Sequence, residues 1–205
     1  MLAMRFSANV AAGDRGLLSD PAHQTRFREN VPVALELAGR IGCRRLNALV
    51  GVRRPDLELE AQLELARENV AWAAEQARAQ GASIMIEAVN SYENGPYLLD
   101  TTAKAMGFLD SVGAGNVQLQ YDVYHLQRME GNLADTISRL LPQIGHVQVA
   151  DPPARSEPGT GEINYRFILG LLEHSGYGGW VGLEYNASTA TTEESLGWIG
   201  ELGYA

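Results

Sequence analysis

Short apolar runs alternate along the chain with longer amphipathic stretches. The runs have the length of buried strands, and the stretches repeat apolar residues at helical spacing. In the first stretch Phe27, Val31 and Leu35 fall on one helical face, which ends near Gly42. The pattern predicts a short strand at MRFSAN, strands over residues 45–50, 83–90, 117–123, 146–150 and 180–185, and helices over about 27–42, 57–80, 101–112, 133–141, 165–174 and 193–202.

Repeated strand–helix units with crossovers of this length favour a parallel sheet with helices outside it. We predict an α/β fold of the TIM (β/α)8-barrel type, apparently shortened to about six strands, because a closed barrel of this kind needs eight. No linker or internal repeat divides the chain. Residues 1–205 are therefore predicted to form a single domain.

Composition and charge narrow the classes of function. The net charge of −9 disfavours a nucleic-acid or acidic-membrane partner. The single cysteine, Cys43, excludes an internal disulfide and suits a reducing cytoplasm. The sequence contains no apolar run of membrane-spanning length and no signal-peptide pattern near Met1, so we expect a cytoplasmic protein.

Four polar residues stand at the tips of successive predicted strands: Glu87, Asp122, Gln148 and Glu184. A lone acidic residue at a strand end is more often solvated or caps the next helix, but four in register converge on one rim of a barrel. Oxygen ligands of this kind suit a hard divalent cation, Mg²⁺ first and Mn²⁺ second, with all four residues as its ligands. Glu87 and Glu184 are the candidate catalytic pair, because one carboxylate can take a proton from a carbon and the other can return one to its neighbour. This chemistry favours aldose–ketose isomerisation or epimerisation over hydrolysis.

Three further residues are candidates for substrate binding. His125 follows Asp122 by three residues and is predicted to reach the same rim, although a lone histidine is more often packed or on the surface. Glu93, in the loop after Glu87, is equally consistent with a pocket wall and a solvated side chain. Arg155, in a loop rich in Gly and Pro, is placed to meet a substrate carboxylate with Glu157 bracing it. The alternative is a simple irregular connection.

At these residues the sequence resembles the hydroxypyruvate isomerase family of xylose-isomerase-like TIM barrels. The motifs that carry the resemblance are IEAVN, LQYDVYHLQRMEGNL, LPQIGHVQVADPPARSEPGTGEINY and GWVGLEY, and it covers residues 11–197. It implies a bound magnesium or similar ion and interconversion of hydroxypyruvate with tartronate semialdehyde, with Glu87 and Glu184 as the proton donor/acceptor pair. It also implies that the substrate is a small anionic hydroxy-oxo acid. The alternatives are a 2-oxo-tetronate isomerase or related sugar-acid isomerase or epimerase, and a non-catalytic truncated barrel.

The sequence departs from the family pattern in one place. MRFSAN runs almost directly into AAGDRG, so about two strand–helix units are apparently deleted after about residue 9. We expect exposed strand edges beside the N-terminal strand and beside residues 46–50. Such edges would favour association into a homo-oligomer.

Overall fold

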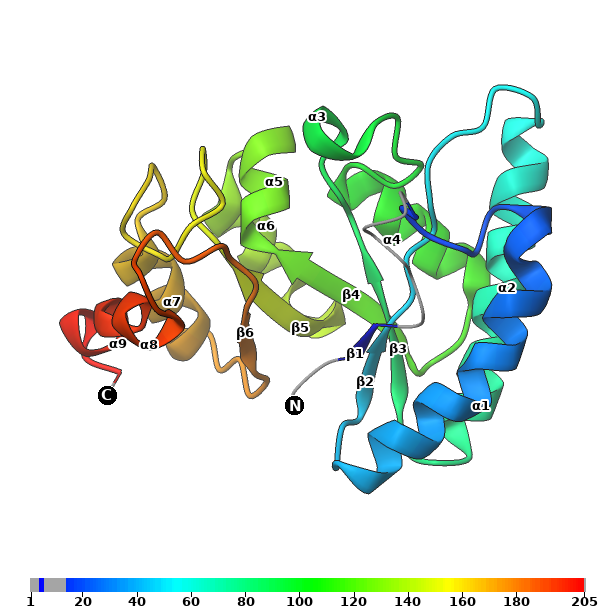
Figure 1. Cartoon of the computed structure of the whole chain (residues 1–205), viewed down its shortest axis with the longest axis horizontal. Coiled ribbons are helices and arrows are strands. Elements are labelled where there is room, and N and C mark those ends of the chain that lie inside the picture. The colour runs from blue at the N-terminus through cyan, green and yellow to red at the C-terminus, as the bar shows by residue number, and fades with distance from the viewer. Residues whose placement is uncertain (1–3, 6–13, 205) are drawn as a thin grey trace.

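The computed structural model describes residues 4–5 and 14–204 of the chain, drawn as a ribbon in Figure 1. Its strands are β1 (Met4–Arg5), β2 (Arg45–Asn47), β3 (Ser83–Glu87), β4 (Val117–Asp122), β5 (Ile144–Val149) and β6 (Val181–Leu183). Its helices are α1 (Gln24–Arg40), α2 (Leu59–Arg78), α3 (Ser91–Asn94), α4 (Thr102–Val112), α5 (Val123–Met129), α6 (Leu133–Leu140), α7 (Tyr165–His174), α8 (Thr192–Ser195) and α9 (Gly197–Leu202), with short 3₁₀ turns η2 (Pro21–His23) and η3 (Leu141–Gln143). The predicted α/β class is confirmed.

The described strands form one parallel sheet in the order β1-β2-β3-β4-β5-β6. This is part of the wall of a TIM barrel, shortened as the sequence predicts. The prediction of an exposed edge beside residues 46–50 was wrong. Leu46 of β2 pairs with Met4 on one side and with Ile84 on the other. Pairing with β1 satisfies the backbone groups of β2. Within the described residues, β1 and β6 are the edge strands instead.

Amphipathic helices cover the sheet and bury their apolar faces against it. Phe27, Val31 and Leu35 of α1 are buried. Thr101 begins α4 by accepting the backbone N–H of Lys104, and Gly113 ends it in a left-handed conformation. In Figure 1, α1 and α2 flank the sheet on one side and α7 to α9 lie at its other end. None of the helices in the described residues is long and apolar enough to cross a membrane.

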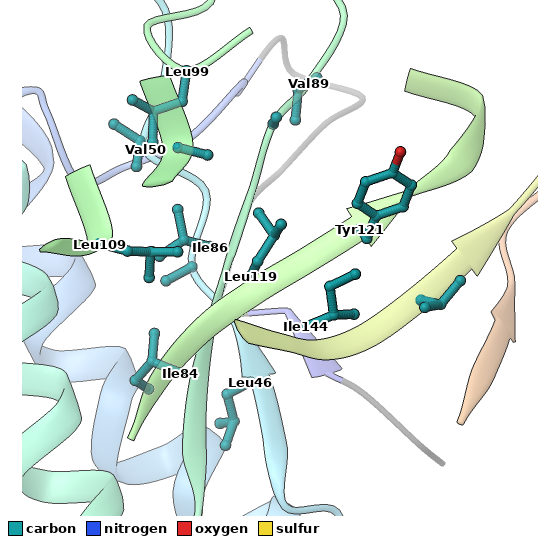
Figure 2. Close-up of a cluster of buried hydrophobic side chains, with 14 of the residues drawn as sticks. Leu46, Val50, Ile84, Ile86, Val89, Leu99, Leu109, Leu119, Tyr121 and Ile144 are labelled. Carbon is teal, nitrogen blue, oxygen red and sulfur yellow. The ribbon is translucent and has the colours of Figure 1, made fainter. Parts of the chain in front are cut away.

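The core consists of aliphatic side chains from neighbouring strands. Figure 2 shows Leu46, Ile84, Leu119 and Ile144, contributed by four successive strands, and Ile86 beside Leu109 of α4. Except for Ile144 and Leu109, which are slightly exposed, these side chains are fully buried. Burying a Leu or Ile side chain contributes roughly 1.5–3 kcal/mol, so this cluster stabilises the folded sheet.

Two short helices were not predicted. The apolar residue Val123 extends the strand pattern of β4, yet Asp122 accepts the backbone N–H groups of Tyr124 and His125 and starts α5. Asn90 likewise accepts the N–H of Glu93 and starts α3. The strands therefore end earlier than periodicity indicates, because polar side chains at their tips cap helices instead.

Candidate active site

The four residues predicted at strand tips lie at the same end of the sheet. Glu87 and Asp122 are the last residues of β3 and β4, Gln148 lies within β5, and Glu184 directly follows β6. Asp122 is paired in register with Gln148. The Glu87 and Asp122 side chains are 1% exposed, whereas that of Glu184 is 34% exposed. The site is therefore buried on its β3–β4 side and open toward β6.

Asn47 holds one oxygen of Glu87. Asn47 ends β2, and its Nδ2 donates to Glu87 Oε2 at 2.6 Å between two buried side chains. The other oxygen, Oε1, lies 3.9 Å from His125 Nε2. Sequence reasoning missed Asn47, although it occupies the strand-tip position one strand before Glu87. Its amide orients the carboxylate toward the site.

The two carboxylate oxygens of Asp122 have different roles: one caps a helix and the other faces the site. Oδ1 accepts the N–H groups that begin α5, at 2.8 Å from Tyr124 and 3.3 Å from His125. Oδ2 is buried and accepts no hydrogen bond from the described residues, but it lies 3.6 Å from both His125 Nε2 and Arg155 Nη2. A buried anionic oxygen of this kind attracts a cation.

Arg155 brings a positive charge into the acidic site. Its Nη2 donates to Glu184 Oε2 at 2.8 Å, and its guanidinium lies 5.1 Å from the centre of the Tyr124 ring. Burial alone lowers the pKa of Arg155, but the charges of Asp122, Glu184 and Glu87 outweigh it and raise that pKa. The prediction that Glu157 braces Arg155 was wrong. Glu157 accepts hydrogen bonds from the backbone and side chain of Ser188 instead.

The loop that carries Arg155 is held by Asp151. This buried carboxylate accepts three backbone N–H groups at 2.9–3.1 Å, from Gly159, Gly161 and Ile163. The loop is so tight that a Cβ on Gly161 would meet the Pro152 carbonyl oxygen at 1.8 Å. The loop is therefore held in one conformation by hydrogen bonds and close packing, and is not a simple irregular connection.

His125 and Glu93 belong to one hydrogen-bonded group at the rim. Asn90 Nδ2 lies 2.7 Å from His125 Nδ1 and donates to Glu93 Oε2 at 3.0 Å. Glu93 also accepts from Tyr124 at 2.6 Å and pairs with Arg128. Burial raises the pKa of Glu93, but the hydrogen bonds from Tyr124 and Asn90 and the charge of Arg128 outweigh it and keep that pKa below its usual value. Its neighbours at the rim thus favour the ionised form of Glu93.

Gln148 and His146 are two residues apart on β5, so their side chains lie on the same face of the sheet. Gln148 accepts from Gln120 Nε2 at 2.5 Å. His146 is buried, and burial together with the charge of Arg45 lowers its pKa to about 4, against the opposing effect of Asp122. Its Nδ1 makes no hydrogen bond with the described residues. A Cβ at Gly182 would lie 2.7 Å from His146 Nε2, so the ring packs directly on β6.

A cavity of about 450 Å³ opens at this end of the sheet. That volume accommodates a small organic acid. Asp14 and Arg15 reach it from the segment before α1. It is lined by Asp14, Arg15, Leu49, Glu87, Val89, Asn94, Tyr97, His125, Arg155, Leu183, Glu184, Tyr185 and Asn186.

The donor set fits a divalent cation. Among the described His, Cys, Asp and Glu side chains, one group of three has ligand atoms within 4.8 Å of one another: Glu87, Asp122 and His125. The buried Oδ2 of Asp122 accepts no hydrogen bond from the described residues, so a bound cation would compensate its negative charge. Carboxylate oxygens dominate the cluster, which suits a hard ion.

These carboxylates lie at the carboxyl ends of parallel strands, which is where TIM-barrel enzymes have their active sites. A family model described as xylose isomerase-like TIM barrel matches residues 5–202. Hydroxypyruvate isomerase of Escherichia coli is 40% identical over 189 residues, which are 92% of this chain and 73% of that protein. The 2-oxo-tetronate isomerase of Cupriavidus necator is 38% identical over 189 residues, 92% of this chain and 72% of that protein. A crystal structure described as AP endonuclease, family 2, from Brucella melitensis matches with a TM-score of 0.91 and 34% identity, covering 98% of this chain and 77% of that one.

The chain therefore belongs to the xylose isomerase-like TIM-barrel family, and it is an isomerase of that family. The resemblance inferred from the strand-tip motifs is confirmed at the level of the family.

Proposed function

We propose that this protein interconverts hydroxypyruvate and tartronate semialdehyde (2-hydroxy-3-oxopropanoate). The observation that carries the proposal is the pair of glutamates that line one cavity from different parts of the sheet, Glu87 at the end of β3 and Glu184 directly after β6. Acid–base transfer between adjacent carbons needs one carboxylate on each side of the substrate.

The two glutamates divide the proton transfers between them. One takes a proton from the hydroxymethyl carbon of hydroxypyruvate, which leaves an enediolate. The other delivers a proton to the neighbouring carbon, while the hydroxyl proton moves from one oxygen to the other. Asn47 keeps the Glu87 carboxylate oriented through its 2.6 Å hydrogen bond. The fixed orientation lowers the entropic cost of reaching the reactive geometry.

A divalent ion, Mg²⁺ first and Mn²⁺ second, would be held by Glu87, Asp122, Gln148 and Glu184. When bound, such an ion polarises the substrate carbonyl and stabilises negative charge on the enediolate oxygens. Arg155 and His125 line the same cavity, and we assign them to substrate binding, Arg155 to the substrate carboxylate. Glu93, paired with Arg128 and Tyr124, supports the rim beside them.

Two alternatives remain distinct from this proposal. A 2-oxo-tetronate differs from hydroxypyruvate by one hydroxylated carbon and uses the same chemistry, and a relative 38% identical carries that name. A truncated barrel without turnover is the alternative of another class. Nucleic acid is disfavoured as a substrate by the net charge of −9, which repels phosphates.

Proton NMR of hydroxypyruvate with the protein in D₂O, with and without Mg²⁺, tests the proposal. We expect deuterium at carbon and appearance of tartronate semialdehyde only with the metal. A parallel incubation with a 2-oxo-tetronate compares kcat/KM for the two substrates. A folded protein that exchanges neither substrate supports the non-catalytic alternative.

A further inference from the structure

The buried side chain of Asn90 has a defined partner for each polar group. Its Oδ1 accepts the N–H of Glu93 at 3.1 Å and caps α3. One N–H of Nδ2 donates to Glu93 Oε2 at 3.0 Å, and Nδ2 lies 2.7 Å from His125 Nδ1. Asn90 is 0% exposed and His125 is 3% exposed, so water does not compete for these contacts.

These partners decide which way the amide of Asn90 faces. Exchanging its oxygen and nitrogen would set an N–H against the N–H of Glu93 and an oxygen against the Glu93 carboxylate. Both contacts would be repulsive, so the amide nitrogen faces His125. An amide nitrogen only donates, and His125 Nδ1 must therefore accept. An imidazole that accepts at Nδ1 carries its proton on Nε2.

The protonated Nε2 of His125 points into the acidic site. It lies 3.6 Å from Asp122 Oδ2 and 3.9 Å from Glu87 Oε1. Distance alone groups His125 with these two carboxylates as a third metal ligand. A nitrogen that carries a proton has no lone pair to give to a metal. The distances are therefore compatible with a metal ligand, whereas the tautomer makes His125 a hydrogen-bond donor.

We propose that Asn90 is a positioning residue that fixes His125 as the Nε2–H tautomer, so that His125 is a hydrogen-bond donor to a substrate oxygen and not a metal ligand. The role of the donor in turnover rests on the proposed function: an N–H aimed between Asp122 and Glu87 stabilises an oxygen that gains negative charge in the enediolate. The tautomer is argued from the contacts of Asn90 and does not depend on the proposed function.

The tautomer is read from ¹⁵N–¹H long-range correlation spectra of the ¹⁵N-histidine-labelled full chain, titrated with MgCl₂. The chain has four histidines, and loss of one set of signals in His125→Gln assigns those of His125. We expect a protonated Nε2 and an unprotonated Nδ1, with and without Mg²⁺. A protonated Nδ1, or loss of the Nε2 proton when Mg²⁺ is added, overturns the proposal. The wild-type spectra decide this point whether or not variants fold and whether or not the substrate is hydroxypyruvate.

The variant Asn90→Asp tests the part played by Asn90. Aspartate keeps a capping oxygen for Glu93 N–H but presents an acceptor to His125 Nδ1, so we expect the ring proton at Nδ1 and a ~10- to 100-fold lower kcat. The matched control is Asn164→Asp, because Asn164 caps α7 through its side-chain oxygen and is exposed. The control should keep the wild-type tautomer and kcat. A folded Asn90→Asp protein that retains the Nε2–H tautomer would exclude the positioning role.

Discussion

Arg155 Nη2 lies 2.8 Å from Glu184 Oε2, so a loop arginine and a strand-tip glutamate form an ion pair across the site. The same nitrogen is 3.6 Å from Asp122 Oδ2. One guanidinium therefore compensates two carboxylates that come from β4 and from the end of β6. The acidic site carries its own counter-charge, and a metal ion bound there would share these carboxylates with it.

Replacing Arg155 by Met should strengthen metal binding and weaken turnover. The positive charge repels a cation at the same carboxylates, so we expect a severalfold lower Kd for Mg²⁺ by titration calorimetry. KM should rise because the substrate carboxylate loses its partner. Arg166→Met is the control, since Arg166 bonds the Glu201 carbonyl on an exposed surface. Weaker Mg²⁺ binding in Arg155→Met would show that the arginine does not compete with the metal.

Glu87→Gln and Glu184→Gln should each remove turnover and leave the protein folded. Each change is isosteric and deletes one acid–base group, which costs about 10²–10⁴ in rate. Turnover is measured by NMR with hydroxypyruvate and folding by circular dichroism. The exposed Glu201→Gln serves as the matched control. A variant that retains near-normal kcat removes its residue from the mechanism.

Asp122→Asn should weaken Mg²⁺ binding at least severalfold without loss of α5. Asparagine still accepts the N–H groups of Tyr124 and His125, but it no longer brings a charge to the site. Asp122→Ala removes both and should also cost about 1 kcal/mol of stability. Calorimetric isotherms and thermal melts of the pair separate the two effects. An isotherm unchanged by either substitution means that Asp122 is not a ligand.

Ser188→Ala should lower stability at neutral pH but not in acid. The hydroxyl and backbone N–H of Ser188 hold the pKa of Glu157 below 4.5, so the folded state favours the ionised carboxylate. The stability from the hydrogen bond between the Ser188 hydroxyl and Glu157 is present above the unfolded pKa of Glu157. It is lost as pH falls through the lowered folded pKa of that carboxylate. The difference in unfolding free energy between wild type and variant, on the order of 1 kcal/mol at pH 7, should shrink below about pH 4. A difference independent of pH would contradict this origin.

The protein should associate through the edges of its sheet. In the described sheet β1 and β6 pair on one side only, and Trp180 beside β6 is 56% exposed. Light scattering should give a mass above the 22.2 kDa of one chain. Trp180→Lys should shift the mass toward one chain, because a charge at an edge opposes pairing. A stable monomer with full isomerase activity would show that the shortened wall needs no partner.

Local patterns in the sequence were enough to predict the parallel strands and the strand-tip residues. Apolar runs that end in Glu87, Asp122, Gln148 and Glu184 predict parallel strands whose tips meet, and the helix over Tyr165–His174 has the predicted bounds. These features depend on periodicity and capping, which operate within about ten residues. The family resemblance rested on the same motifs, and the match of the family model confirms it.

Contacts between distant segments were decided only by the tertiary structure. Asn47 meets Glu87, Asn90 meets His125, and Arg155 meets Glu184 instead of Glu157. Each pair depends on the register of neighbouring strands and on the rotamers available at their tips, and periodicity carries no information about either. Pairing of β1 with β2 was decided in the same way, because a strand edge pairs with whichever strand the folded chain brings beside it.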